Sequence, residues 1–331
     1  MTMPALFVGH GNPMNAIKDN EFSRTWADLG RSLPRPKGIV CVSAHWETDG
    51  TCVTAMENPA TIHDFSGFPA ALENMRYPAP GSPELADRVM SVARSTRIRA
   101  DRSWGLDHGT WSVLCRMYPQ ADIPVVQLSL DAGAPPDLHY ELGRELGELR
   151  REDVLILGSG NMVHNLRVMA WQEEGFDWAV EGDGAMAERI SAADHQALVH
   201  YEKLPHARQA IPTEEHYLPL LYVLGAAGTG EPAAFFNDRV TLGSVSMRGV
   251  RMGQEGRFAR LMIASDKRTT AVMTTRTSPV PQKRPKAALN LAAPEAQTTI
   301  HAEATSNAAP ANMPAEPVRT FVSQPDPQAS F

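Results

Sequence analysis

The sequence predicts an α/β fold: a single domain whose central, mostly parallel sheet is flanked by helices. Two features of the chain support this class. Short, continuously apolar runs bounded by Pro, Gly or Asp recur along it, and such runs are typical of strands buried on both faces. Stretches with apolar residues at helical spacing lie between them, and strands that alternate with helices favour parallel pairing through crossover connections.

Four runs are predicted as strands of this sheet. Each is too short for an ordinary helix and is rich in apolar side chains. In chain order they are residues 5–9 (ALFVG), 38–44 (GIVCVSA), 123–130 (IPVVQLSL) and 153–160 (DVLILGSG). Ligand sites in parallel sheets lie at the carboxyl ends of the strands, so side chains just beyond these runs are candidates for function.

Four further stretches are predicted as helices. Residues 83–95 and 138–150 repeat apolar side chains at helical spacing, which places them on one helix face. A third helix is expected from about residue 183 to residue 201. Residues 217–224 are apolar enough for the start of a buried helix.

Two segments depart from this alternation. Residues 46–80 are rich in loop signals, aromatic residues and proline, and a loop region of this length is often functional. Residues 254–331 are expected to be a disordered tail. From Ser278 onward this segment has nine prolines among Ala, Thr, Gln and Glu, and so few large apolar residues cannot offset the entropy of ordering.

Charge and cysteine content indicate which partners and which cellular compartment to expect. The net charge of −7 argues against nucleic acid or an anionic membrane as a partner. The three cysteines form no CxxC pair and suit a reducing compartment. The N-terminus lacks the regions of a signal peptide, and no apolar run approaches the roughly 20 residues that span a bilayer. We therefore expect a cytoplasmic protein.

Five histidines are the most informative residues of the chain. Neutral imidazole is a common ligand for transition metals and is well suited to proton transfer near neutral pH. Three of the five follow predicted strands, so they are expected on one rim of the sheet. The five are His10, His45, His108, His164 and His216.

Four of these histidines also have an ordinary structural role open to them. His10 lies in a turn sequence, HGNP, where its side chain can form an ordinary hydrogen bond. His216 can form a hydrogen bond at the N-terminus of a helix, and in that case Glu214 or Glu215 could equally be the metal ligand. His108 follows Asp107, which can form a surface pair with the imidazole or orient it. His164 follows a glycine-rich segment at the end of a strand, which could instead be a phosphate-binding loop. The phosphate-loop patterns GxGxxG and GxxxxGK[ST] are absent, however.

Other catalytic signatures are missing from the sequence. The zinc-hydrolase motif HExxH, the GxSxG elbow and the CxxC pair do not occur. Ser43 and Ser159 lie near histidines in sequence, but neither has the surroundings of a serine nucleophile. A metal site built on histidines is the remaining interpretation.

The sequence around these histidines resembles the class III extradiol ring-cleavage dioxygenases, the LigB-like superfamily, and within it the DOPA 4,5-dioxygenase type. The similarity spans residues 4–253, so residues 1–253 are expected to form the catalytic domain. The matching motifs are GHGNPMNA (9–16), SAHW (43–46), YPAPGSPELA (77–86), DHGTW (107–111), GSGNMVHNL (158–166), EHYLPLLYVLGAA (215–227) and GSVSMRGVRMG (243–253).

This resemblance implies one non-haem iron(II), with zinc as a second metal that the site accepts. His10, His45 and His216 would be the ligands, with Glu215 as the fallback because the superfamily often uses two histidines and a glutamate. His108 would be the acid–base residue and His164 a substrate-binding imidazole. The substrates would be O₂ and a catechol with a DOPA-like 3,4-dihydroxyphenyl group.

Two alternatives and one accessory feature complete the prediction. A zinc-dependent hydrolase would use the same imidazoles with a metal-bound water, and a Memo-like protein of this fold would bind a partner without catalysis. Residues 46–80 are a candidate lid over the substrate ring, through His63, Phe65, Phe68 and Tyr77.

Overall fold

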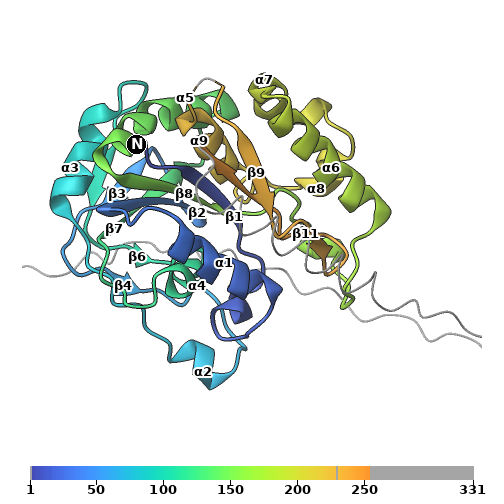
Figure 1. The fold of residues 1–331 in the computed structure, drawn as a ribbon, viewed down its shortest axis with the longest axis horizontal. Helices are drawn as coiled ribbons and strands as arrows, with labels where there is room; N and C mark the ends of the chain where they lie inside the picture. The colour runs from blue at the N-terminus through green and yellow to red at the C-terminus, as the bar shows by residue number, and fades with distance from the viewer. Residues whose placement is uncertain (1, 229, 254–331) are drawn as a thin grey trace, which may run out of the picture. The chain divides into compact units, whose positions relative to one another are not determined.

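The computed structural model describes residues 2–228 and 230–253, which form an α/β domain around one large sheet (Figure 1). The prediction for residues 254–331 lies outside the described residues. Eight strands form the sheet in the order β5-β3-β7-β2-β8-β1-β12-β9. Their bounds are β1 Ala5–Gly9, β2 Gly38–Thr48, β3 Cys52–Thr54, β5 Arg99–Asp101, β7 Val125–Asp131, β8 Val154–Gly160, β9 Ala233–Phe236 and β12 Gly249–Met252.

The four strands predicted from sequence form the centre of this sheet. β7, β2, β8 and β1 lie side by side in that order, and all three pairings between them are parallel. The strands that the sequence did not predict extend the sheet, with β12 and β9 antiparallel at one edge. Two small two-stranded sheets complete the strand set: β4 Ala60–Thr61 with β6 Gly105–Leu106, and β10 Val240–Thr241 with β11 Val245–Ser246.

Helices cover both faces of the sheet, as its burial pattern requires. Neighbouring β2 residues enter opposite cores: Val40 and Val42 lie in one apolar cluster, Ile39 and Cys41 in the other. One face is covered by α1 Glu21–Ser32 and α4 His108–Met117, and the other by α3 Pro83–Val92, α5 Pro136–Leu146 and α9 Leu218–Ala226. Strands buried on both faces explain the continuous apolar runs in the sequence.

Two predicted helices differ in extent from the observed ones. The stretch from 183 to 201 is divided: α6 spans Asp177–Ser191 and α7 spans His195–Val199, with Ala193 between them at a positive φ of 54°. The stretch at 138–150 becomes α5 followed by a 3-10 turn, η2 Gly147–Glu152. The shorter elements are η1 Pro13–Ala16, α2 Ala70–Glu73, η3 Leu166–Val168, η4 Tyr201–Lys203 and α8 Ala207–Ala210.

The sequence pattern did not predict helices α1 and α4, and each has a physical reason. Helix α1 is largely polar but carries a capping box at Asn20 and Ser23, and it buries Trp26 and Leu29. Helix α4 is buried almost all round, so it has no polar face to give a clear helical period. Within the part of the chain that the structure describes, none of the helices combines the length and apolarity needed to cross a membrane.

Candidate metal centre and active site

The first two candidate histidines lie toward the carboxyl ends of β1 and β2, the two parallel strands that flank β8. His10 directly follows β1, and its backbone N–H donates to the carbonyl of Gly160 at the end of β8. His45 lies inside β2 rather than after it, because the strand continues to Thr48. Pairing with β8 stops at Ser43, and the pairing with β7 shifts register between Val42 and Glu47. This irregular strand end directs His45 toward the rim.

The third candidate reaches the same place from the segment before α9. The His216 carbonyl accepts a hydrogen bond from the backbone N–H of Asn161, directly after β8. The chains approach so closely that a β-carbon at Gly160 would lie 2.1 Å from that carbonyl oxygen. Glycine at the end of β8 therefore permits the segment that carries His216 to lie against the strand.

These three side chains converge on one point. The Nε2 atoms of His10 and His45 lie 3.1 Å apart. The ring of His216 lies 5.4 Å from that of His10 and 5.1 Å from that of His45, between centroids. One ring nitrogen from each lies within 4.8 Å of the others.

Hydrogen bonding determines which nitrogen of His10 is free. The Ser159 hydroxyl donates its one proton to the Gly109 carbonyl at 2.6 Å, so it accepts from Nδ1 of His10 at 3.0 Å. A proton on Nδ1 leaves a lone pair on Nε2. In the same way Nδ1 of His45 faces the Asp64 carboxylate at 3.3 Å, and Nδ1 of His216 faces the Glu215 carboxylate at 3.0 Å.

The chemistry of this donor set fits a divalent metal ion. Burial lowers the pKa of His10 well below its usual value, and it also lowers the pKa of His216. Burial, with the neighbouring imidazoles, brings the pKa of His45 to about 2. Neutral imidazoles whose lone pairs face one another at 3.1 Å repel unless a cation lies between them.

Two other groups of potential ligands overlap this one: His45, Asp64 and His108, and His164, Glu215 and His216. Their carboxylates are already engaged by the Nδ1 protons of neighbouring histidines. Although burial opposes ionisation, hydrogen bonds from His216 and His108 hold the pKa of Glu215 and of Asp64 at about 2 each. Glu215, the fallback ligand, thus lies where it orients His216, a common partner for a metal-bound imidazole.

His108 is the first residue of α4, and Asp64 positions it. Nδ1 of His108 donates to Oδ2 of Asp64 at 2.8 Å, and the backbone N–H of His108 donates to Oδ1 at 3.0 Å. The sequence-based interpretation that Asp107 orients this imidazole is wrong. The Asp107 carboxylate instead caps α4, accepting from the Thr110 N–H and the Ser43 hydroxyl.

Sequence reasoning missed Asp64, although it singled out the loop that carries it. Asp64 lies in TIHDFSGFP, 44 residues before His108. No local spacing relates the two positions. The available signal was an acidic residue between aromatic residues in a loop already considered functional.

A cavity of about 310 Å³ opens over the histidines. This size suits a small aromatic molecule, and most of the wall beyond the imidazoles is apolar. The ring of His164 stacks on that of His216, with 3.5 Å between centroids. The lining residues are His10, Gly11, Asn12, Pro13, His45, Phe68, His108, His164, Leu166, Met169, Trp171, His216, Leu242 and Val245.

The proposed lid residues separate into different roles. Phe68 lines the cavity, and the ring of Phe65 packs edge-on against His108 at 5.5 Å. Tyr77 is not part of a lid, because it is 2% exposed and its hydroxyl donates to the Tyr118 carbonyl. Nε2 of His63 pairs with the Met75 carbonyl at 2.9 Å, and its ring packs on Trp111. Substrate binding by His63 stays a prediction.

Comparisons with known proteins find similarity over most of the described residues. The model of the family described as catalytic LigB subunit of aromatic ring-opening dioxygenase matches residues 4–246. The 4,5-DOPA dioxygenase extradiol of Escherichia coli (strain K12) is 48% identical over 257 residues, covering 76% of this chain and 95% of the relative. The protein of that name from Beta vulgaris is 38% identical over 240 residues, covering 70% and 90%.

A solved structure shows the same similarity. An uncharacterized protein from Escherichia coli K12 matches with a TM-score of 0.66 at 44% identity, covering 76% of this chain and 100% of that chain.

Proposed function

Since this chain belongs to the family of catalytic LigB subunits of aromatic ring-opening dioxygenases, we propose that it opens the ring of a DOPA-like catechol at the 4,5 bond. Extradiol ring opening is the activity of the family, and it makes the protein an enzyme. The substrate and the position of cleavage are inferred from relatives named 4,5-DOPA dioxygenase extradiol. One observation carries the proposal: three neutral imidazoles, of which His10 and His216 are buried and His45 is half-buried, converge beneath a cavity of the size of a small aromatic molecule.

We assign the metal ligands to His10, His45 and His216, and the metal to iron(II). Three ligands on one side of an ion leave open positions for two substrates. Bound iron(II) would supply coordination of the catechol oxygens and of O₂, and a path for electron density between them. Zinc would fit the same nitrogen donors, but it has no redox chemistry to contribute.

The protein's own residues bind the ring and move protons. The apolar cavity wall, which includes Phe68 and Met169, holds the ring and excludes water. His108 lines the cavity and Asp64 holds its Nδ1, so the remaining nitrogen, Nε2, can accept a catechol proton and return it later. Asp64 stabilises the imidazolium that forms in between. His164, stacked on His216, offers a second polar group to the substrate.

The alternative functions have less support. A zinc hydrolase or a Memo-like binding protein would account for the three imidazoles, but neither explains why the relatives are ring-opening enzymes. The cytoplasmic location and the absence of nucleic-acid or membrane partners stay predictions. The partners we propose are the catechol and O₂.

Oxygen consumption tests the proposal directly. The protein is loaded anaerobically with Fe(II), mixed with L-DOPA and exposed to air. We expect one O₂ consumed for each catechol and a yellow product. Bound iron with no oxygen uptake on L-DOPA or simple catechols would refute the proposal, and oxygen-independent hydrolysis with Zn(II) would favour the hydrolase.

A further inference from the structure

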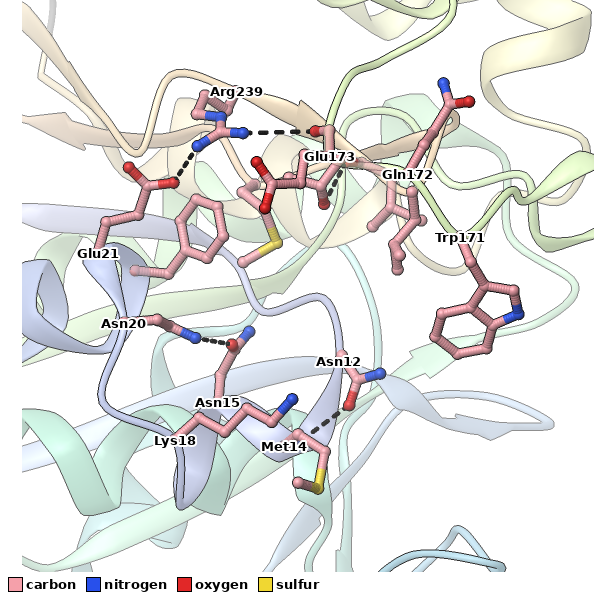
Figure 2. A pocket seen from close by; sticks show the side chains of 15 residues that line it. Asn12, Met14, Asn15, Lys18, Asn20, Glu21, Trp171, Gln172, Glu173 and Arg239 are labelled. Atoms are coloured by element: carbon pink, nitrogen blue, oxygen red, sulfur yellow. Dashed lines mark hydrogen bonds and ion pairs between the residues drawn. The ribbon is translucent and has the colours of Figure 1, made fainter.

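A second cavity of about 390 Å³ adjoins the one that contains the histidines (Figure 2). Four residues line both cavities: Asn12, Trp171, Leu242 and Val245. A ligand whose ring lies over the histidines can therefore extend a substituent past Asn12 and Trp171 into the second space. That space is the more polar of the two, since it is walled by asparagines and charged side chains.

Two opposite charges on facing walls have no partner within the described part of the chain. Figure 2 shows Lys18 on the wall formed by the segment after His10, and Glu173 on the facing wall beside Arg239. None of the ion pairs or side-chain hydrogen bonds among described residues involves the Lys18 ammonium or the Glu173 carboxylate. Arg239, by contrast, is engaged by the Glu21 carboxylate and the Glu173 carbonyl.

Hydrogen bonds hold the backbone of Lys18 in place, and its side chain is exposed. The Lys18 carbonyl accepts hydrogen bonds from the Arg116 guanidinium at 2.9 Å and the Ser23 hydroxyl at 2.8 Å. Nearby, the Asn12 side-chain oxygen accepts from the Met14 N–H, so its amide group presents donors at the junction of the two cavities. The second cavity thus offers a cation on an anchored backbone, a facing anion and amide donors.

We propose that the second cavity binds the α-amino-acid group of the substrate, with Lys18 pairing to the carboxylate and Glu173 to the ammonium. This inference rests on the proposed function and assigns the two residues that would recognise the zwitterionic end of its substrate. A simple anion would meet Glu173 and a simple cation would meet Lys18. A zwitterion satisfies both charges together.

The test compares four catechols on the Fe(II)-loaded protein: L-DOPA, dopamine, 3,4-dihydroxyphenylpropionate and 4-methylcatechol. In Lys18→Met, kcat/KM for L-DOPA relative to dopamine should fall roughly fivefold, because only L-DOPA loses a carboxylate contact. In Glu173→Gln, kcat/KM for L-DOPA relative to 3,4-dihydroxyphenylpropionate should fall by a similar factor. The change should lie in KM, since neither residue touches the reacting atoms.

Lys37→Met is the matched control. It removes the same charge just before β2, at the opposite end of that strand from His45, and should keep the wild-type ratios. Ratios in Lys18→Met and Glu173→Gln equal to those of the control would overturn the inference while leaving ring cleavage intact.

Equilibrium binding separates this failure from failure of the proposed function. L-DOPA is titrated by calorimetry into the Fe(II)-loaded protein under nitrogen, where turnover cannot occur. The dissociation constant should rise roughly fivefold in Lys18→Met even if no catechol is cleaved in air. An unchanged dissociation constant in both variants would overturn the inference whatever the activity.

Discussion

Replacing Asp64 with Asn should slow ring opening far more than it weakens the fold. The Asp64 carboxylate accepts from Nδ1 of His108 at 2.8 Å and from its backbone N–H at 3.0 Å, and it lies 3.3 Å from Nδ1 of His45. The amide of Asn keeps the shape but loses the negative charge that stabilises the imidazolium of His108. A hydrogen bond to a charged group contributes about 1.5–3 kcal/mol, which corresponds to a loss of roughly 10- to 150-fold in kcat.

The assay must separate catalysis from metal loading, because Asp64 also touches a proposed ligand. Weakened orientation of His45 is expected to lower metal affinity roughly 10- to 100-fold. Oxygen uptake is therefore measured at saturating Fe(II), with bound iron determined in parallel. Asp122→Asn is the control, since Asp122 pairs with Arg35 on the surface. Wild-type kcat for Asp64→Asn at full iron occupancy would show that the carboxylate does not assist His108.

Three further predictions follow from the same structure. His10→Ala should abolish binding of Fe(II), measured as iron per protein after desalting, and a wild-type iron content would remove His10 from the ligand set. His108→Ala should keep its iron but lose roughly 10²- to 10⁴-fold in kcat; wild-type turnover would refute its acid–base role. Burial lowers the pKa of His139 from 6.5 to about 4, so between those values the unfolded chain binds a proton that the folded chain does not. Acidification from pH 7 to pH 4 should therefore cost about 3 kcal/mol of stability through this residue. Urea unfolding at both pH values should show a smaller loss in His139→Gln, and equal losses would contradict the assignment.

The central strands and the five histidines were predictable because the signal for each is local. A strand buried on both faces needs an unbroken apolar run, and β1, β7 and β8 match the predicted runs within two residues at each end. Histidines just beyond such runs follow the general rule for ligand sites in parallel sheets. The resemblance to a known family then assigned them roles.

The edge of the sheet and the exact position of His45 could not be predicted from the sequence. Strands β12 and β9 are short. The place of β12 beside β1 depends on a pairing between residues more than 240 positions apart in sequence, Ala5 and Met252, and β9 in turn pairs with β12. The position of His45 inside an irregular strand end depends on where β2 stops pairing with β8. No run of residues in β2 alone encodes that point.

The sequence therefore determined the α/β class, the central strands and the imidazoles of the site, since these depend on residue type and on neighbours along the chain. Only the tertiary structure decided how those imidazoles are held and what surrounds them. Asp64 lies against His108 across 44 residues, and Ser159 bonds His10 across 149. The second cavity joins Lys18 to a wall that contains Glu173. Contacts of this kind form when distant segments pack together, because folding optimises burial and hydrogen bonding over the whole chain at once.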